Sequence, residues 1–142
     1  MPILSTPEVQ LHYQTFGDAS NPALVFSNSL GTNYGMWQQQ IHALKDQFFV
    51  VCYDTRGHGA SSTPTGPYSL KQLGEDVIQL LDHLQISKAA FCGISMGGLT
   101  GQWLAIHYPE RFSHVVVCNT AAKIGQEQAW LDRAALVQAQ GL

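Results

Sequence analysis

A serine flanked by glycines lies between an apolar run and a helix-like segment, in the stretch CGISMGG at residues 92–98. Gly93, Ser95 and Gly97 form the pattern G-x-S-x-G, which is typical of a sharp strand-to-helix turn that carries a nucleophile. Such a turn strains the serine backbone, and glycines two residues away relieve the crowding. N–H groups at the start of the following helix can stabilise an oxyanion beside the hydroxyl. The spacing therefore predicts a serine nucleophile.

The glycines and the histidines are also compatible with other types of site. The glycines could form a tight turn with a surface serine, or a phosphate loop, but the G-x-G-x-x-G spacing of that loop is absent. The six histidines show no pair with metal-ligand spacing, and HExxH does not occur. We therefore expect neither a metal nor another cofactor.

The segments around this serine alternate between two types of pattern. Apolar runs rich in Val and Phe are typical of strands covered on both faces. Amphipathic segments separate them, and the clearest begins with Ser69 and Gln72 in the spacing of a capping box. The alternation predicts an α/β fold, with a mostly parallel sheet and helices on both faces. The expected strands span 11–17, 22–28, 48–54, 88–94 and 114–120. The expected helices span 36–44, 69–84, 96–108 and 126–140. The last helix is expected to have Trp130, Leu131, Ala134 and Leu136 on its apolar side.

Composition excludes several classes of partner. The net charge is −3 and basic residues form no block, so neither nucleic acid nor an anionic membrane surface is expected to bind. The amino terminus lacks the pattern of a secretory signal, and no apolar run approaches the roughly 20 residues of a membrane span. The three cysteines lie in strand-like runs without a CxxC pair, which is typical of reduced, buried thiols in a cytoplasmic protein.

Two further motifs accompany the serine. DTRGHGASS, at residues 54–62, follows a predicted central strand, and SNSLGTNYGMW spans residues 27–37. With CGISMGG, they make the sequence similar to the α/β-hydrolase superfamily, and within it to the 3-oxoadipate enol-lactonases, which tend to carry N-S-L-G-T where most relatives have His-Gly. CNTAAKIG at 118–125, followed by Trp130 and Arg133, resembles the entry to their lid. The resemblance covers essentially the whole chain.

This resemblance implies roles for five residues. Ser95 would be the nucleophile, and the backbone N–H groups of Leu30 and Met96 would bind the oxyanion. Trp130 and Arg133 would contact the substrate, a small ester or lactone. The implied reaction is hydrolysis of 3-oxoadipate enol-lactone to 3-oxoadipate in the catabolism of aromatic compounds.

The resemblance also implies that parts of the site lie elsewhere. In this fold the triad acid and histidine follow the serine on later strands, whereas the chain ends just inside the lid-like region. We therefore expect the amino-terminal half of an enzyme: residues 1–125 as part of the core, with five or six of eight strands, and 126–142 as the start of the lid. Such a chain would be inactive alone, and its unpaired sheet edge would offer a route to self-association.

Some alternatives and local assignments complete the prediction. Another α/β hydrolase, such as a carboxylesterase or a cofactor-free haloperoxidase, shares the same motifs, and so would a non-catalytic interaction module. His58 is interpreted as a loop residue, and it is the first candidate base if the chain alone is active. His12 is placed at an element end, Asp54 in a turn, and Arg56 as a brace for its loop.

Overall fold

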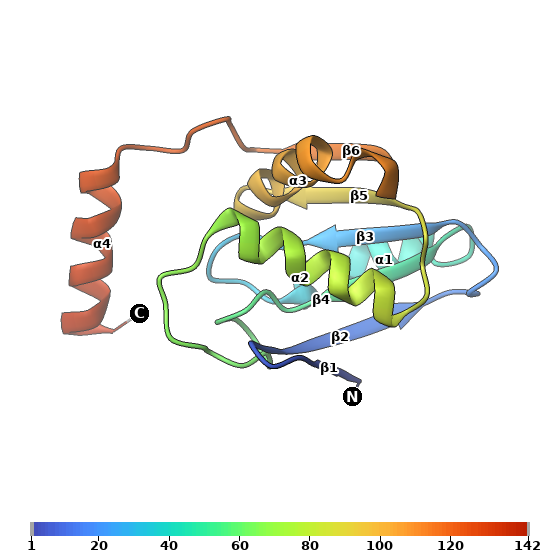
Figure 1. The fold of residues 1–142 in the computed structure, drawn as a ribbon, viewed down its shortest axis with the longest axis horizontal. Helices are drawn as coiled ribbons and strands as arrows, with labels where there is room; N and C mark the ends of the chain where they lie inside the picture. The colour runs from blue at the N-terminus through green and yellow to red at the C-terminus, as the bar shows by residue number, and fades with distance from the viewer. Residues whose placement is uncertain (1, 142) are drawn as a thin grey trace.

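The computed structural model describes residues 2–141, so Met1 and Leu142, at the outer ends of the predicted core and lid segments, lie outside the described residues. Strands and helices alternate along the chain (Figure 1). The strands are β1 (Ile3–Ser5), β2 (Gln10–Phe16), β3 (Ala23–Ser27), β4 (Phe49–Tyr53), β5 (Ala89–Ile94) and β6 (Phe112–Cys118). The helices are η1 (Tyr34–Trp37), α1 (Gln38–Leu44), α2 (Leu70–His83), α3 (Met96–His107), η2 (Pro109–Arg111) and α4 (Glu127–Gln140).

The strands form a single mixed sheet in the order β1-β2-β4-β3-β5-β6. Strands β4, β3, β5 and β6 run parallel, whereas β1 and β2 are antiparallel to their neighbours. Val25 at the centre of β3 lies opposite Val51 on one side and Phe91 on the other. The predicted α/β fold, with a mostly parallel sheet, is confirmed.

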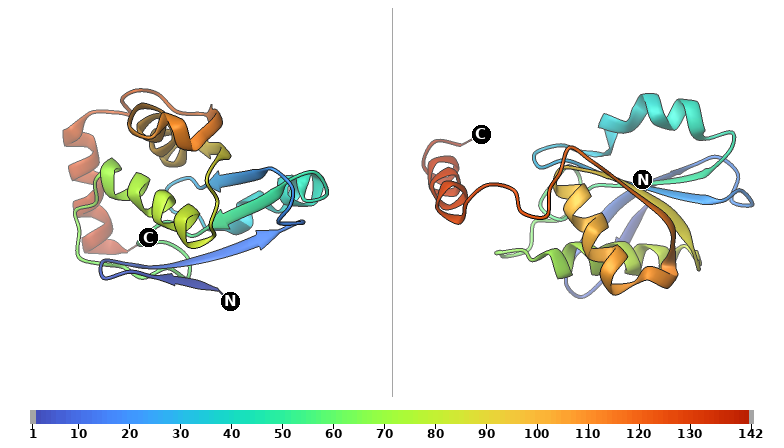
Figure 2. Two further views of the ribbon diagram at one scale, coloured as in Figure 1. Left: turned by 45° about the vertical axis from the view of Figure 1, so that its right-hand side comes forward. Right: turned by 90° about the horizontal axis from the view of Figure 1, so that it is seen from above.

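Helices cover both faces of this sheet. Helix α1 lies on one face, and α2 and α3 lie on the other (Figure 2). Each interface has its own apolar core: Leu80, Leu81 and Phe91 are buried on the α2–α3 side, and Phe26 stacks on Trp37 at 4.4 Å on the α1 side. Burial of large apolar side chains on both faces explains the continuous apolar runs of the central strands.

Local signals account for most element boundaries. The Ser69 side chain accepts the Gln72 N–H, and the Gln72 side chain accepts the Ser69 N–H, so the predicted capping box starts α2. The 36–44 segment differs from the prediction, because it opens as the short helix η1 after Asn33 accepts the Gly35 N–H. Strand β1 was not predicted, since three residues are too short to show a pattern.

Helix α4 lies at one end of the molecule, beyond the carboxyl ends of the parallel strands (Figure 1). The predicted apolar side of this helix is wrong for two of its four residues. Leu131 is 56% exposed and Leu136 is 54% exposed, whereas Trp130 and Ala134 line a cavity together with Val137. The apolar residues are spread around the helix rather than gathered on one face, so the position of the helix against the core decides which side is covered.

A buried ion pair joins the loop after β4 to helix α2. The Arg56 guanidinium donates two hydrogen bonds of 2.7 Å to the Asp76 carboxylate, and both residues are buried. The interpretation of Arg56 as a brace for its loop is confirmed.

Within residues 2–141, no helix is long and apolar enough to cross a membrane.

Removing one partner of this pair should destabilise the fold strongly. We expect Arg56→Met to lower the free energy of unfolding by about 3–5 kcal/mol, because Asp76 is left as an unpaired buried charge. The double variant Arg56→Met/Asp76→Leu should recover most of that loss, since no charge then remains buried. Urea denaturation followed by circular dichroism measures both values.

Lys71→Met provides the control, because Lys71 and Glu75 form an exposed pair at 3.7 Å. Its loss should cost less than about 1 kcal/mol. If Arg56→Met lowered the free energy of unfolding as little as Lys71→Met does, a structural role for the buried pair would be contradicted.

Candidate active site

Ser95 lies at the turn between β5 and α3 with φ 54° and ψ −113°. Its N–H donates to the carbonyl of Cys118 at 2.9 Å, and the Thr120 hydroxyl donates to the Ser95 carbonyl at 2.9 Å. The predicted strand-to-helix turn is confirmed, and the positive φ is the predicted strain of the serine backbone. A non-glycine residue rarely adopts this conformation, and such backbone strain typically concentrates at functional sites.

The glycines of the motif allow the turn to pack against its neighbours. A Cβ atom on Gly93 would collide with the Gly97 carbonyl, and one on Gly97 would collide with the Ser27 carbonyl. The Gly97 N–H also donates to the Asn28 carbonyl at 3.0 Å. The turn is thus held against the end of β3, the strand that leads into the loop with Leu30.

Asn28 is a buried hub that connects three elements. Its amide group donates to the Tyr53 carbonyl at 2.8 Å and accepts the Trp37 indole N–H at 2.9 Å. Its own carbonyl receives the Gly97 N–H. Because its side chain and carbonyl are bonded to three different segments, the position of the backbone is fixed at the point where it continues to Leu30.

Asp54 forms a second hub. Its carboxylate accepts the Tyr34 N–H at 2.8 Å and the Ala60 N–H at 2.9 Å, and the His12 Nδ1 lies 3.1 Å away. Asp54 follows the end of β4 and His12 lies near the start of β2, as expected, but both are buried, which the sequence did not predict. The antiparallel pairing of β2 with β4, with Tyr13 opposite Tyr53, brings them together.

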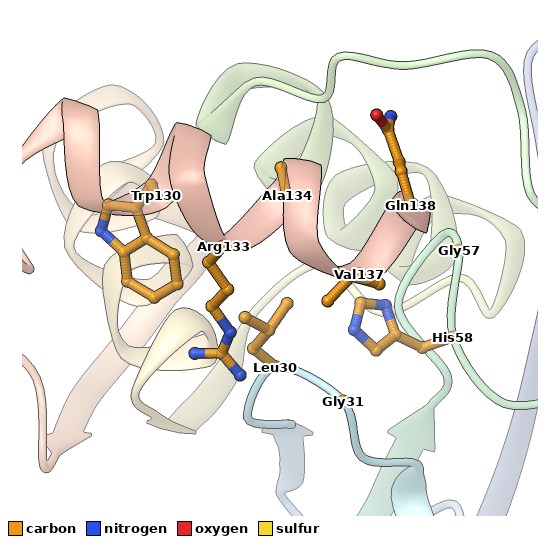
Figure 3. A pocket seen from close by; sticks show the side chains of 9 residues that line it. All are labelled: Leu30, Gly31, Gly57, His58, Trp130, Arg133, Ala134, Val137 and Gln138. Atoms are coloured by element: carbon orange, nitrogen blue, oxygen red, sulfur yellow. The ribbon is translucent and has the colours of Figure 1, made fainter. Parts of the chain in front are cut away.

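Two neighbouring cavities lie at this end of the sheet, and one of them adjoins the Ser95 turn. The first, of about 220 Å³, is lined by Leu30, Ser95, Met96, Leu99, Ile124 and Trp130. The second, of about 430 Å³, is lined by Leu30, Gly31, Gly57, His58, Trp130, Arg133, Ala134, Val137 and Gln138 (Figure 3). Leu30 and Trp130 border both cavities. Of the predicted site residues, Ser95, Leu30, Met96 and Trp130 thus meet in one cavity, and Arg133 lies in the adjacent one.

Trp130 and Arg133 share one side of α4, as their spacing predicts. The Arg133 guanidinium lies 5.5 Å from the centre of the Trp130 ring. The Trp130 indole N–H donates to the Ile124 carbonyl at 2.6 Å, which holds the ring against the segment that precedes α4. The guanidinium is therefore next to an aromatic face that can stabilise its charge.

The other side chains that could act as nucleophiles are unsuited to it. Burial raises the pKa of Cys52 to about 12 and that of Cys92 to about 11, so both thiols stay protonated at neutral pH. In the described part of the chain, no group of three or more His, Cys, Asp or Glu residues could hold a metal ion. The site thus offers a hydroxyl on a strained turn.

The histidines contact groups other than Ser95. His12 lies beside Asp54, and His58 is bonded to the Arg56 carbonyl. The remaining bonded pairs are His83 with the Tyr13 hydroxyl and His107 with the Trp103 carbonyl.

The comparisons with known proteins agree with this geometry. Residues 22–140 match the profile of the alpha/beta hydrolase fold, and the chain belongs to this family. It is 70% identical over 139 residues to 3-oxoadipate enol-lactonase 2 of Acinetobacter baylyi, covering 98% of this chain and 52% of that protein. The crystal structure of the enol-lactonase from Burkholderia xenovorans LB400 superposes with a TM-score of 0.96 at 46% identity, covering 99% of this chain and 55% of that one.

A second relative, 3-oxoadipate enol-lactonase 1 of Acinetobacter baylyi, is 55% identical over 132 residues and is covered to 49% of its length. The chain therefore spans about half the length of the curated relatives it matches. The resemblance to enol-lactonases that the motifs indicated is confirmed.

The strain at Ser95 makes a prediction about stability. We expect Ser95→Gly to be more stable than Ser95→Ala by about 1 kcal/mol or more, because alanine keeps the Cβ that disfavours positive φ and glycine does not. Thermal and urea unfolding of the two variants measure the difference. Ala105→Gly, at an exposed position inside α3, is the control and should lower the free energy of unfolding by about 1 kcal/mol. If Ser95→Gly were less stable than Ser95→Ala, the turn would carry no strain.

Proposed function

We propose that this chain forms the nucleophile-bearing part of a carboxylic ester hydrolase that opens 3-oxoadipate enol-lactone to 3-oxoadipate in aromatic catabolism. The observation that carries the proposal is the position of Ser95, on a strained turn in one cavity with Leu30 and Met96. The family and the 70% identity to an enol-lactonase supply the substrate class.

In the proposed mechanism, Ser95 Oγ attacks the lactone carbonyl. The backbone N–H groups of Leu30 and Met96 stabilise the resulting oxyanion. Met96 is the first residue of α3, where N–H groups have no acceptor one turn earlier. Collapse of the tetrahedral intermediate breaks the ring C–O bond. The released enolate oxygen takes the proton that the general base removed from Ser95, and the resulting enol tautomerises to the ketone. Water then hydrolyses the acyl-serine ester. Each oxyanion donor would lower the activation free energy by roughly 3–4 kcal/mol.

A serine needs a general base for this reaction. We place that histidine, and the acid that orients it, in the half of the relatives that this chain does not match. Residues 1–125 would then belong to the catalytic core and 126–142 would begin the lid, with α4 extending over the cavities. This division follows the family order of serine, acid and histidine.

Arg133 and Trp130 are proposed to contact the substrate. The enol-lactone carries a carboxylate besides its ring ester, and arginine is the side chain that best matches a carboxylate. The cavity that holds Arg133 adjoins the Ser95 cavity through Leu30 and Trp130. A ligand of small size could therefore present its ester to Ser95 and its carboxylate to Arg133.

One observation favours a second candidate function, that of a non-catalytic interaction module. Strand β6 forms an edge of the sheet, and its Val116 and Val117 are exposed. An exposed apolar edge can pair with another strand, which would support self-association.

The free thiols Cys52, Cys92 and Cys118 support the proposal of a cytoplasmic location.

Hydrolysis assays separate these functions. We expect the purified chain to hydrolyse the enol-lactone slowly or not at all, because binding and oxyanion donors alone leave a modest rate. A chimaera in which this chain replaces the matched segment of Acinetobacter baylyi enol-lactonase 2 should turn over the lactone, and Ser95→Ala should abolish that activity. A folded chimaera without activity would contradict the proposal. Fast turnover by the chain alone would instead reveal an internal base, with His58 the first candidate.

The carboxylate contact is tested with Arg133→Met in the same chimaera. We expect kcat/KM to fall about 10- to 150-fold for the lactone and to stay unchanged for a neutral ester of similar size, since a charged hydrogen bond contributes about 1.5–3 kcal/mol. Gln138→Ala, at an uncharged position of the same cavity, is the control. Equal losses on both substrates would indicate lid packing, and no loss would exclude Arg133 from the site.

A further inference from the structure

His58 presents one ring nitrogen to the larger cavity. Its Nδ1 lies 3.1 Å from the Arg56 carbonyl, and because a carbonyl only accepts, Nδ1 carries the proton in this bond. The ring lines the cavity, and Nε2 is directed toward the side from which Arg133 enters (Figure 3). The two side chains come from segments far apart in the sequence and lie on either side of Leu30 (Figure 3).

The chemistry of this cavity suits an anion on a short carbon chain. Leu30, Ala134 and Val137 provide apolar walls. Among the cavity residues that the structure describes, His58 and Arg133 are the titratable ones, and no carboxylate is among them. Arg133 is always charged at physiological pH, so the cavity combines a fixed positive charge with a second nitrogen that can gain one.

The loop that carries His58 is held more firmly than the helix that carries Arg133. The His58 N–H donates to the Thr55 carbonyl at 2.9 Å, and the Gly57 N–H donates to the Ser62 carbonyl at 2.9 Å. In contrast, none of the described residues of α4 is buried. The imidazole can therefore set the position of a ligand relative to the core, which a side chain on an exposed helix cannot do alone.

We propose that His58 is a specificity-determining residue that binds the substrate carboxylate through Nε2, opposite Arg133; this rests on the proposed function. A carboxylate only accepts hydrogen bonds, and Nδ1–H is already used, so Nε2 must be protonated in the complex. Histidine exchanges protons near neutral pH.

The surrounding charges are compatible with this protonation. Behind the loop, the Arg56 guanidinium is neutralised by Asp76 at 2.7 Å. The Tyr68 ring lies beside Gly57 and under Arg56, with its hydroxyl donating to the Pro64 carbonyl at 2.6 Å. Arg133 faces His58 from α4, so the bound carboxylate shields two cations from each other.

Calorimetric titration of the chain at pH 7.5 tests the inference, because its own residues line the cavity. The probes are adipate and, as a neutral counterpart, dimethyl adipate. We expect adipate to bind at least about tenfold more tightly than the diester.

Two variants separate the ring nitrogens. His58→Asn keeps a polar group at the Nδ1 position and loses Nε2, so adipate affinity should fall about tenfold. His58→Gln keeps a polar group near the Nε2 position and should retain more affinity than His58→Asn. His107→Asn is the matched control, because His107 bonds the Trp103 carbonyl through Nδ1 at 2.8 Å but lies on α3, outside the cavity.

The inference is overturned if adipate binds no better than the diester, if His58→Asn binds adipate as wild type does, or if His107→Asn loses as much. Thermal unfolding of each variant confirms that it is folded, and His58→Gln keeps the test decisive if His58→Asn is not. Turnover by the chimaera is a separate measurement. Adipate binding with no turnover would contradict the enol-lactonase activity alone, whereas turnover with unaltered binding in His58→Asn would contradict the role of His58 alone.

Discussion

The close approach between the Ser95 turn and the end of β3 is the constraint on which the site depends. The backbone at Gly97 lies against the carbonyls of Ser27 and Asn28 and is bonded to the latter. This contact places the serine hydroxyl and the loop of Leu30 at the same edge of the sheet. A strained residue costs of order 1–3 kcal/mol, and the cores on both faces of the sheet supply the stability that tolerates it.

Two buried polar residues convert this approach into a defined cavity. Asn28 bonds β4 and η1, and Asp54 bonds the loop of Tyr34 and the loop of Ala60. Apolar packing alone has little direction, whereas an unpaired buried polar group costs about 1–3 kcal/mol. The loops that border the cavities therefore have one arrangement in which every bond of these two side chains is made.

The two walls of the larger cavity differ in how they are supported. The inner wall, with Gly57 and His58, belongs to loops bonded to the core, whereas α4 supplies the outer wall from an exposed helix. Under the proposed function, chemistry at Ser95 would require atoms placed to within fractions of an ångström. Substrate recognition would tolerate an outer wall that is ordered by the ligand itself.

The sequence by itself determined the features that depend on near neighbours in the chain. The glycine spacing around Ser95, the capping box at Ser69 and the apolar runs of the central strands predicted the turn, the helix α2 and the α/β sheet, because sterics and periodicity act within a few residues. The family motifs added the likeness to enol-lactonases. Only the tertiary structure decided that His12 meets Asp54, that Trp37 bonds Asn28, and which side of α4 faces the cavity. These contacts join elements whose separation in the chain carries no periodic signal, and strand pairing and packing alone bring them together.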